Sequence, residues 1–224
     1  MHDTSTLASQ LAAYQAGFKQ RVAPERVTMM ESAIAALEAT GIEQTALKVG
    51  DAAPDITLPD ALGRDVSLRS LWQQGPLVLI FYRGGWCPYC NLELRAWQQR
   101  LADLGAAGAR LVAISPQTPD NSLSTAQKNE LGFAVLSDSS LAASRGFGLA
   151  FALAPELVEL YKEIGNDLPT QNGNGQWVLP VPATYVIDRQ GRIAFAHVVA
   201  DYRERAEPQE VLSALERLRD SAPI

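Results

Sequence analysis

The stretch PLVLIFY, residues 76–82, runs directly into RGGWCPYC, residues 83–90. An unbroken apolar run of this length is typical of a central strand that is buried on both faces. The two glycines after it predict a tight turn, and Pro88 suits the first position of a helix, where its missing N–H would have no partner. A strand, a turn, a C-x-x-C pair and a helix therefore follow one another, with Cys87 at the helix N-terminus.

Further strand and helix patterns continue on the C-terminal side of this unit. A hairpin turn is indicated by Asp188-Arg189-Gln190-Gly191. The segment 149–177 is ambiguous apart from a helical part near 155–164. The order predicts an α/β fold with a mixed central sheet and helices on both faces. We expect strands at 110–115, 133–136, 184–188 and 192–198, and helices at 88–104, 119–131, 141–148 and 208–220.

The part of the chain before this unit has a different pattern. Residues 4–42 show the apolar spacing of two short helices, and residues 48–68 indicate a β-hairpin. We therefore divide the chain into an N-terminal helical extension, 1–46, and a main domain, 47–224. The apolar faces of two short helices must be buried, either as a cap on the main domain or against a second subunit in a homodimer.

Composition excludes several classes of partner. The chain has 224 residues, 47% of them hydrophobic, with a net charge of -6 and a pI of about 5.0. An acidic chain is a poor ligand for nucleic acid or for an anionic membrane surface. No apolar run approaches the roughly 20 residues of a spanning helix, and the first residues lack a signal-peptide pattern. We expect a cytoplasmic protein, in which a lone cysteine pair is sooner catalytic or metal-binding than structural.

Cys87-Pro88-Tyr89-Cys90 is the feature that carries chemistry. Two cysteines with this spacing at a helix N-terminus can close a disulfide with little backbone movement. The unpaired N–H groups and the helix dipole favour the thiolate, which is the nucleophile. Cysteine pKa values fall from about 8.5 to roughly 3.5–7.5 in such surroundings.

Three other interpretations of the pair remain open. A structural disulfide would constrain the unfolded chain little across so short a loop. A zinc site would need two further ligands, and the remaining soft candidates are His2 and His197. The two thiols could also be packed together by chance. We expect neither a metal nor an organic cofactor.

The chain resembles the peroxiredoxins of the alkyl-hydroperoxide-reductase/thiol-specific-antioxidant family, in the thioredoxin superfamily. The resemblance covers about residues 47–220. It rests on Phe81-Tyr82 and on an opening segment with the motifs Val49-Gly50-Asp51, Ala53-Pro54-Asp55, Leu58-Pro59-Asp60 and Val66-Ser67-Leu68. It implies a thioredoxin-like fold and a thiol-dependent antioxidant oxidoreductase.

Laid against peroxiredoxins, Cys90 falls on the peroxidatic cysteine and Glu93 on the acidic residue three positions later. Arg83 and Cys87 stand where that family carries proline and threonine, and Pro182 stands where it carries a late arginine. The threonine and arginine of the family hold the peroxide, so this chain departs from the family's peroxide site.

Laid against thioredoxins, Cys87 is the exposed nucleophile and Cys90 the buried resolving thiol. Val181-Pro182-Ala183-Thr184 then matches the loop whose cis-proline faces the pair. The chain thus resembles peroxiredoxin-like proteins that carry a thioredoxin-type C-x-x-C.

This resemblance implies reduction of hydroperoxides through a redox-active disulfide of Cys87 and Cys90, with a thioredoxin- or glutathione-type reductant. A thioredoxin-like reductase of protein disulfides is the alternative. A non-enzymatic redox sensor, which would show no sustained flux, is the second alternative.

Four residues near the pair have a functional and a structural interpretation. Arg83 could stabilise a thiolate or be a solvated loop arginine. Trp86 could form a substrate platform or pack over the turn. Glu93 could relay protons, or it could be an acidic residue that the helix dipole favours in the first turn. Pro182 could be a cis-proline of the site or an ordinary trans-proline at a strand start.

Overall fold

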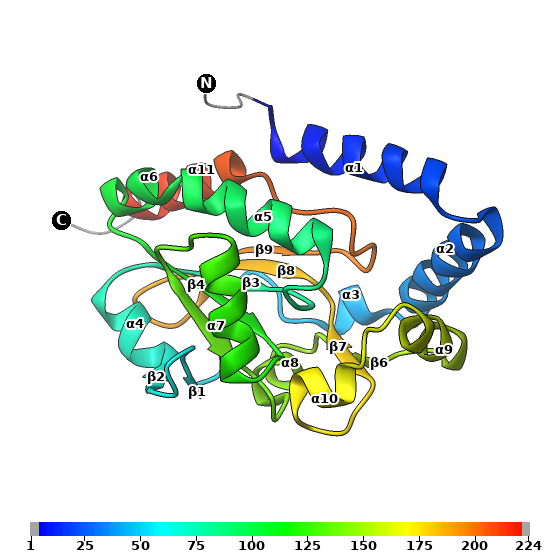
Figure 1. Cartoon of the computed structure of the whole chain (residues 1–224). Coiled ribbons are helices and arrows are strands. Elements are labelled where there is room, and N and C mark those ends of the chain that lie inside the picture. Colours follow the sequence, from blue (N-terminus) through cyan, green and yellow to red (C-terminus); the bar gives the residue numbers. More distant parts are fainter. Residues whose placement is uncertain (1–4, 221–224) are drawn as a thin grey trace.

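The central element is a five-stranded mixed sheet in the order β5-β4-β3-β8-β9. The computed structural model describes residues 5–220 of the chain (Figure 1). Strands β3, β4 and β5 are parallel, whereas β8 and β9 run antiparallel to their neighbours. The predicted mixed sheet is confirmed. The strands are β3 Leu77–Phe81, β4 Arg110–Ser115, β5 Ala134–Ser137, β8 Ala183–Ile187 and β9 Ile193–Val198.

Strand β3 is buried along its whole length, as its apolar run predicts. Val78 and Ile80 point into one half of the core, together with the apolar sides of α5 and α11, and Leu77 and Leu79 point into the other half with α4 and α8. Figure 1 shows α5, α6 and α11 on one side of the sheet and α4 and α8 on the other. The helices around this sheet are α4 Leu68–Gln74, α5 Pro88–Gln99, α6 Leu101–Ala106, α7 Pro119–Lys128, α8 Ala142–Gly146 and α11 Pro208–Asp220.

Two parts of the chain differ from the sequence prediction. The helix expected over 88–104 divides into α5 and α6 at Arg100, whose backbone leaves the helical range. The ambiguous segment 149–177, together with the three residues after it, forms a second small sheet and two helices: β6 Ala150–Ala152, α9 Pro155–Glu163, α10 Leu168–Asn172 and β7 Val178–Pro180. Strands β6 and β7 are too short for a periodic pattern, since each has three residues. The predicted hairpin at the start of the domain is present as β1 Thr57–Pro59 and β2 Asp65–Ser67.

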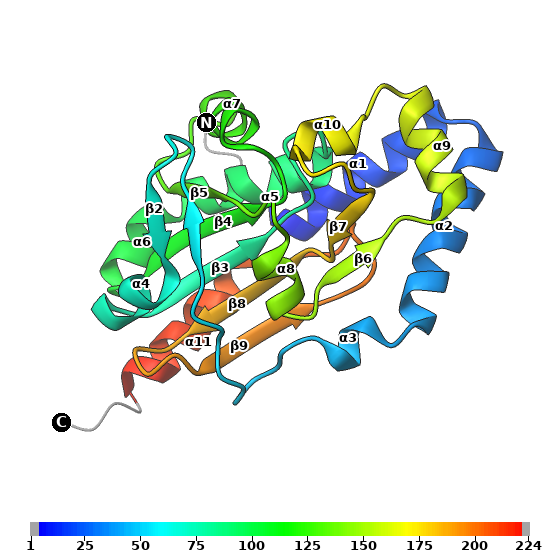
Figure 2. The same ribbon diagram turned by 90° about the horizontal axis from the view of Figure 1, so that it is seen from below.

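The N-terminal helices pack on the domain of the same chain. They are α1 Leu7–Arg21, α2 Pro24–Ala39 and α3 Ile42–Thr45. Leu7 and Leu11 join the core on the α5 side, and the Tyr14 ring meets the Tyr89 ring edge-on at 5.1 Å. Figure 2 shows α1 beside α5 and α2 turning away toward α9. Of the two predicted roles, a cap on the main domain or a contact with a second subunit, the extension therefore has the first.

Polar contacts fix both ends of this cap. The Glu207 carboxylate accepts hydrogen bonds from the backbone N–H groups of Leu7 and Ala8, at 3.3 and 2.6 Å, and so caps the first turn of α1. Arg26 on α2 pairs with Glu163 on α9 at 2.9 Å. Among residues 5–220, the helices are all too short or too polar to span a bilayer.

Deleting residues 1–46 tests the division into two parts, which stays a prediction. We expect the remaining domain to fold with a lower free energy of unfolding, because the buried Leu7 and Leu11 side chains are lost. Each such leucine contributes about 1.5–3 kcal/mol. Urea unfolding followed by circular dichroism measures the change, and the full chain carrying Leu7→Ala and Leu11→Ala is the matched control. A truncated chain that does not fold at all would show that the division is wrong.

Candidate active site

The turn before the cysteine pair requires its two glycines. A Cβ on Gly84, which has φ +147°, would lie 2.4 Å from Trp86 Nε1, and a Cβ on Gly85 would lie 2.2 Å from Thr125 Oγ1. The Gly85 N–H donates to Gln117 Oε1 at 2.7 Å. The close approach of α7 and of the loop after β4 thus holds the turn in a fixed shape.

Cys87 is the N-cap residue of α5, and Cys90 lies in the first turn of that helix. Both thiols are free, with 1% of Cys87 and none of Cys90 exposed. The prediction that Cys87 is exposed is therefore wrong. Its sulfur lies in a core cluster that includes Tyr89 of α5 and Leu11 of α1, and local sequence does not show that α1 packs there.

Arg83 is buried, so its interpretation as a solvated loop arginine is wrong. Its guanidinium carbon lies 4.1 Å from the ring centre of Tyr202, 5.0 Å from that of Trp86 and 5.8 Å from that of Tyr161. It also donates a hydrogen bond to the Tyr161 hydroxyl. Burial opposes the charged form, but nearby Tyr161 and Cys87 stabilise it and hold the pKa of Arg83 above its ordinary value. The site therefore contains a permanent buried cation that is surrounded by three aromatic rings.

The two cysteines have opposite pKa shifts. Burial raises the pKa of Cys87, but the hydrogen bond from Cys90 and the positive charges of Arg83 and Arg205 outweigh it and lower this pKa to about 6. Burial and the same hydrogen bond raise the pKa of Cys90 well above its usual value. The lowered pKa of Cys87 predicts a thiolate at this position at neutral pH, next to a protonated Cys90.

A buried ion pair lies behind Cys90. Arg205 Nε donates to Glu93 Oε2 at 2.6 Å, and Arg205 Nη2 lies 3.5 Å from Cys90 Sγ. Burial raises the pKa of Glu93 to about 7 even though the Arg205 charge lowers it. Glu93 therefore lies in the site and titrates near neutrality, which the proton-relay hypothesis needs, but the relay itself stays a prediction.

Sequence reasoning missed Arg205 and Tyr202. Both belong to the loop before α11, in the segment Tyr-Arg-Glu-Arg at 202–205, where charged residues usually face solvent. Arg205 also donates to the backbone oxygen of Glu204 at 2.6 Å and to that of Tyr202, so its guanidinium is held in place. In the alignment with peroxiredoxins, Pro182 stands at the position of the family's late arginine. In this chain Arg205, from the loop before α11, places a cation beside Cys90 instead.

Pro182 is not a cis-proline, since residues 5–220 contain no cis peptide bond. The segment continues in extended form from β7 into β8, and the Val181 N–H donates to the Leu149 carbonyl at 2.9 Å. An ordinary trans-proline at the start of a strand fits this path, which was the alternative interpretation. Pro182 lines a small cavity next to Arg83.

Trp86 is half-buried, and its ring meets the Tyr161 ring edge-on at 5.5 Å. It packs over the turn and against Arg83, so a role as a substrate platform stays a prediction. Among residues 5–220 there is no group of three or more histidine, cysteine or acidic side chains that could hold a metal ion. His2, considered above as a zinc ligand, lies outside these residues.

Comparison with known proteins agrees with this fold. Residues 49–196 match the sequence profile of the AhpC/TSA family. The chain belongs to this family. A putative peroxiredoxin of Mycobacterium tuberculosis is 30% identical over 162 residues, which are 72% of this chain and 89% of that relative. Peroxiredoxin Bcp of Escherichia coli is 34% identical over 104 residues, 46% of this chain and 65% of its own length.

Solved peroxiredoxin structures share the fold. Peroxidoxin BcpB from Mycobacterium tuberculosis superposes with a TM-score of 0.62 at 22% identity, covering 77% of this chain and 99% of that one. Peroxiredoxin 6 of Arenicola marina gives 0.60 at 14% identity, covering 77% and 74%. The thioredoxin-like fold is confirmed, and the chain is an oxidoreductase, a thiol-dependent peroxidase of peroxiredoxin type. Arg205, Tyr202 and helix α2 lie outside the matched residues 49–196.

Replacing Arg205 by methionine in this peroxiredoxin should destabilise the fold. Glu93 would lose its buried partner, and removing one member of a buried pair costs about 3–5 kcal/mol. Urea unfolding at pH 8, where Glu93 is mostly ionised, measures the loss. The double variant Glu93→Gln, Arg205→Met should lose less, because no buried carboxylate remains.

Arg100→Met is the matched control, since its ion pair with Asp103 is partly exposed and such pairs contribute about 0–1 kcal/mol. Equal losses for Arg205→Met and Arg100→Met would contradict a stabilising role of the buried pair.

Proposed function

We propose that this peroxiredoxin-type enzyme reduces hydroperoxides through a dithiol–disulfide cycle in which Cys87 attacks and Cys90 resolves. The assignment is supported by the place of Cys87 at the N-cap of α5 and by the opposite directions in which the surroundings shift the pKa values of the two sulfurs. Cys87, with its pKa lowered to about 6, lies at the N-terminus of α5 beside Arg83, whereas Cys90 stays protonated. The thiolate is the reactive form of cysteine.

In the first step the Cys87 thiolate attacks one peroxide oxygen and the O–O bond breaks. The sulfur is oxidised to a sulfenic acid, and the electron pair of the broken bond leaves on the second oxygen as an alkoxide or hydroxide. This anion takes up one proton and departs as an alcohol or water. The buried Arg83 charge next to Cys87 stabilises the negative charge as it passes from sulfur to oxygen.

In the second step Cys90 attacks the sulfenic sulfur of Cys87. An S–S bond forms, the S–O bond breaks, and the hydroxide leaves with the proton of the Cys90 thiol as water. Glu93 is the candidate relay for this proton, because its pKa of about 7 lets it accept and return one near neutral pH.

A dithiol reductant closes the cycle. Two thiols of a thioredoxin- or glutathione-type donor become a disulfide while the Cys87–Cys90 bond returns to two thiols. Such a donor operates in a reducing compartment, and we therefore propose that the enzyme works in the cytoplasm. A homodimer also stays a prediction, to be checked by size-exclusion chromatography with light scattering.

The two alternative functions gain no support. With 1% of Cys87 exposed, a small hydroperoxide meets less hindrance at this sulfur than a protein disulfide does, and a protein reductant needs a local opening of the site. A sensor would oxidise once without sustained flux.

A turnover assay separates the three functions. Hydrogen peroxide, an organic hydroperoxide and a protein disulfide are offered in turn, with a thioredoxin system as reductant. We expect sustained consumption of hydroperoxide and the Cys87–Cys90 disulfide in the oxidised enzyme by mass spectrometry. Turnover of the protein disulfide alone, or a single oxidation with no flux, would overturn the proposal.

A further inference from the structure

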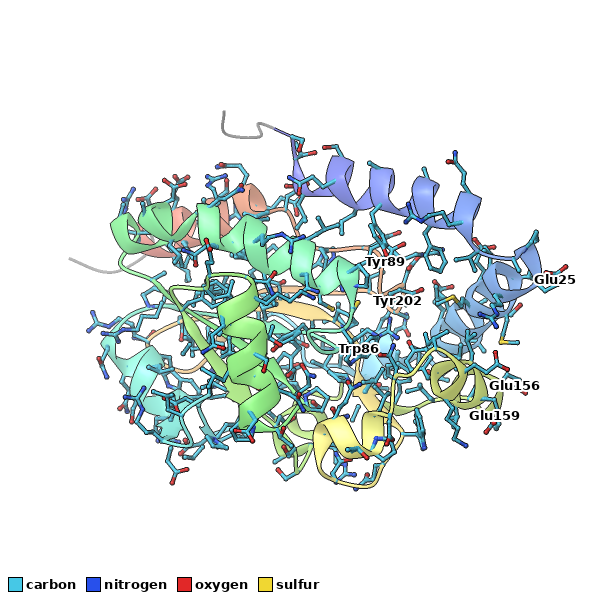
Figure 3. All side chains as sticks on the ribbon, in the orientation of Figure 1. Glu25, Trp86, Tyr89, Glu156, Glu159 and Tyr202 are labelled. Carbon is cyan, nitrogen blue, oxygen red and sulfur yellow. The ribbon has the colours of Figure 1, made fainter. Side chains whose placement is uncertain are left out.

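A small cavity lies beside Arg83 under the N-terminal cap. One part of its lining is Arg83 with Tyr161 and Tyr202, and another part is Met30 and Ile34 of α2 with Leu157 of α9. Figure 3 shows Trp86 and Tyr202 in the region between the start of α5 and the helices α2 and α9. The cavity is thus apolar except where it meets the guanidinium.

Arg83, which lines this cavity, has an unsatisfied donor. Arg83 is 4% exposed, and its Nε, which is buried, has no hydrogen-bond partner. The same guanidinium stabilises the thiolate of Cys87. A buried donor without a partner costs free energy, so a ligand with an oxygen atom beside this donor would be favoured. The neighbouring walls suit an uncharged organic group.

The volume of the cavity limits what fits. It has about 30 Å³ of space for the centres of water-sized groups. By this measure one such group needs about 10–15 Å³, so the cavity holds two or three. This is enough for a hydroperoxy group with a very small substituent, and a larger substituent must displace a wall.

We infer that helix α2 sets an upper limit on the size of the organic group of the hydroperoxide, with Met30 as the main specificity-determining residue. The inference rests on the proposed function. Met30 is half-buried on α2, outside the residues that match the family, so this wall belongs to the extension of this chain. Met30 does not belong to the core cluster that holds the two cysteines, so we expect a shorter side chain here to leave that pair in place.

Met30→Ala tests the inference. We expect the ratio of kcat/KM for cumene hydroperoxide to kcat/KM for hydrogen peroxide to rise about tenfold, which is the usual effect of a small change in an apolar pocket. Met29→Ala is the matched control, because Met29 is the preceding residue of the same helix but is exposed, and its ratio should equal that of the wild type. Circular dichroism checks that each variant is folded.

A second measurement needs no peroxidase activity. Cys87 is alkylated with iodoacetamide and with the bulkier N-phenylmaleimide, and the ratio of the two rates is compared between wild type and Met30→Ala. We expect the bulky reagent to gain about tenfold in the variant. If neither ratio changes, or if Met29→Ala changes them equally, the inference is wrong. If the alkylation ratio changes but the wild type consumes no hydroperoxide, the proposed function fails. The limit that Met30 sets on the size of groups that reach Cys87 then still stands.

Discussion

Cys87→Ser is expected to abolish peroxidase turnover, with a loss of roughly a thousandfold or more in kcat/KM. A serine hydroxyl is not ionised near pH 7, whereas the Cys87 pKa of about 6 keeps its sulfur mostly as thiolate. Cys90→Ser should behave differently. Its Cys87 can still react once with a hydroperoxide, but the sulfenic acid then has no thiol partner within the chain. Stopped-flow measurement of peroxide consumption should show a single stoichiometric burst and then no turnover by the thioredoxin system.

The pair of variants also distinguishes the two alignments made from the sequence. In Cys90→Ser, a sulfenic acid trapped with dimedone should be found on Cys87 by mass spectrometry. If instead Cys87→Ser keeps the burst and carries the trapped sulfenic acid on Cys90, then Cys90 is the attacking thiol, as the alignment with peroxiredoxins places it. Cys87 would then be the resolving thiol, and the assignment from pKa would be wrong.

Arg83→Met is expected to raise the pKa of Cys87 and to lower the reaction rate at neutral pH. In the wild type the rate constant for peroxide should rise as pH increases through about 6 and then level off, because the thiolate is formed in this range. A return to the roughly 8.5 of a free thiol would leave only about 3% thiolate at pH 7. If the pKa of Cys87 returns fully to this value, the expected loss of rate at pH 7 is about 30-fold. If the remaining charge of Arg205 holds the pKa lower, the expected loss is about 10-fold.

The pH profile separates an electrostatic role of Arg83 from a structural one. If the cation acts through the pKa of Cys87, the variant should recover most of its rate at pH 9.5, where the thiolate forms without help. Arg83→Lys keeps a charge and should fall between the wild type and Arg83→Met. An unchanged midpoint near pH 6 in Arg83→Met would contradict the assignment. A shifted midpoint with a loss that persists at pH 9.5 would indicate that Arg83 also stabilises the leaving oxygen.

Local pattern was sufficient for much of the fold. Strand β3 is continuously apolar because both of its faces are buried, and this is visible in residues 76–82 without any knowledge of partners. The position of Cys87 at a helix N-terminus follows from Pro88 and from the glycine turn, which are signals within a few residues. The same holds for the hairpin between β8 and β9 and for helices α1 and α2. Motifs distributed over residues 47–220 were enough to indicate the family.

The environment of the cysteines could not be read in this way, because it is made by residues far apart in the chain. Arg205 pairs with Glu93, which lies 112 positions away in the sequence. Helix α1 covers α5, although the sequence of neither helix indicates that the two pack together. Exposure of Cys87 was therefore predicted wrongly from its place in a turn. Arg83 proved to be a buried cation because Tyr161 of helix α9 and Tyr202 of the loop before α11 pack against it. Periodicity shows which face of an element is apolar. Which other element covers that face, and so which charge ends up beside which sulfur, is fixed only when the whole chain packs.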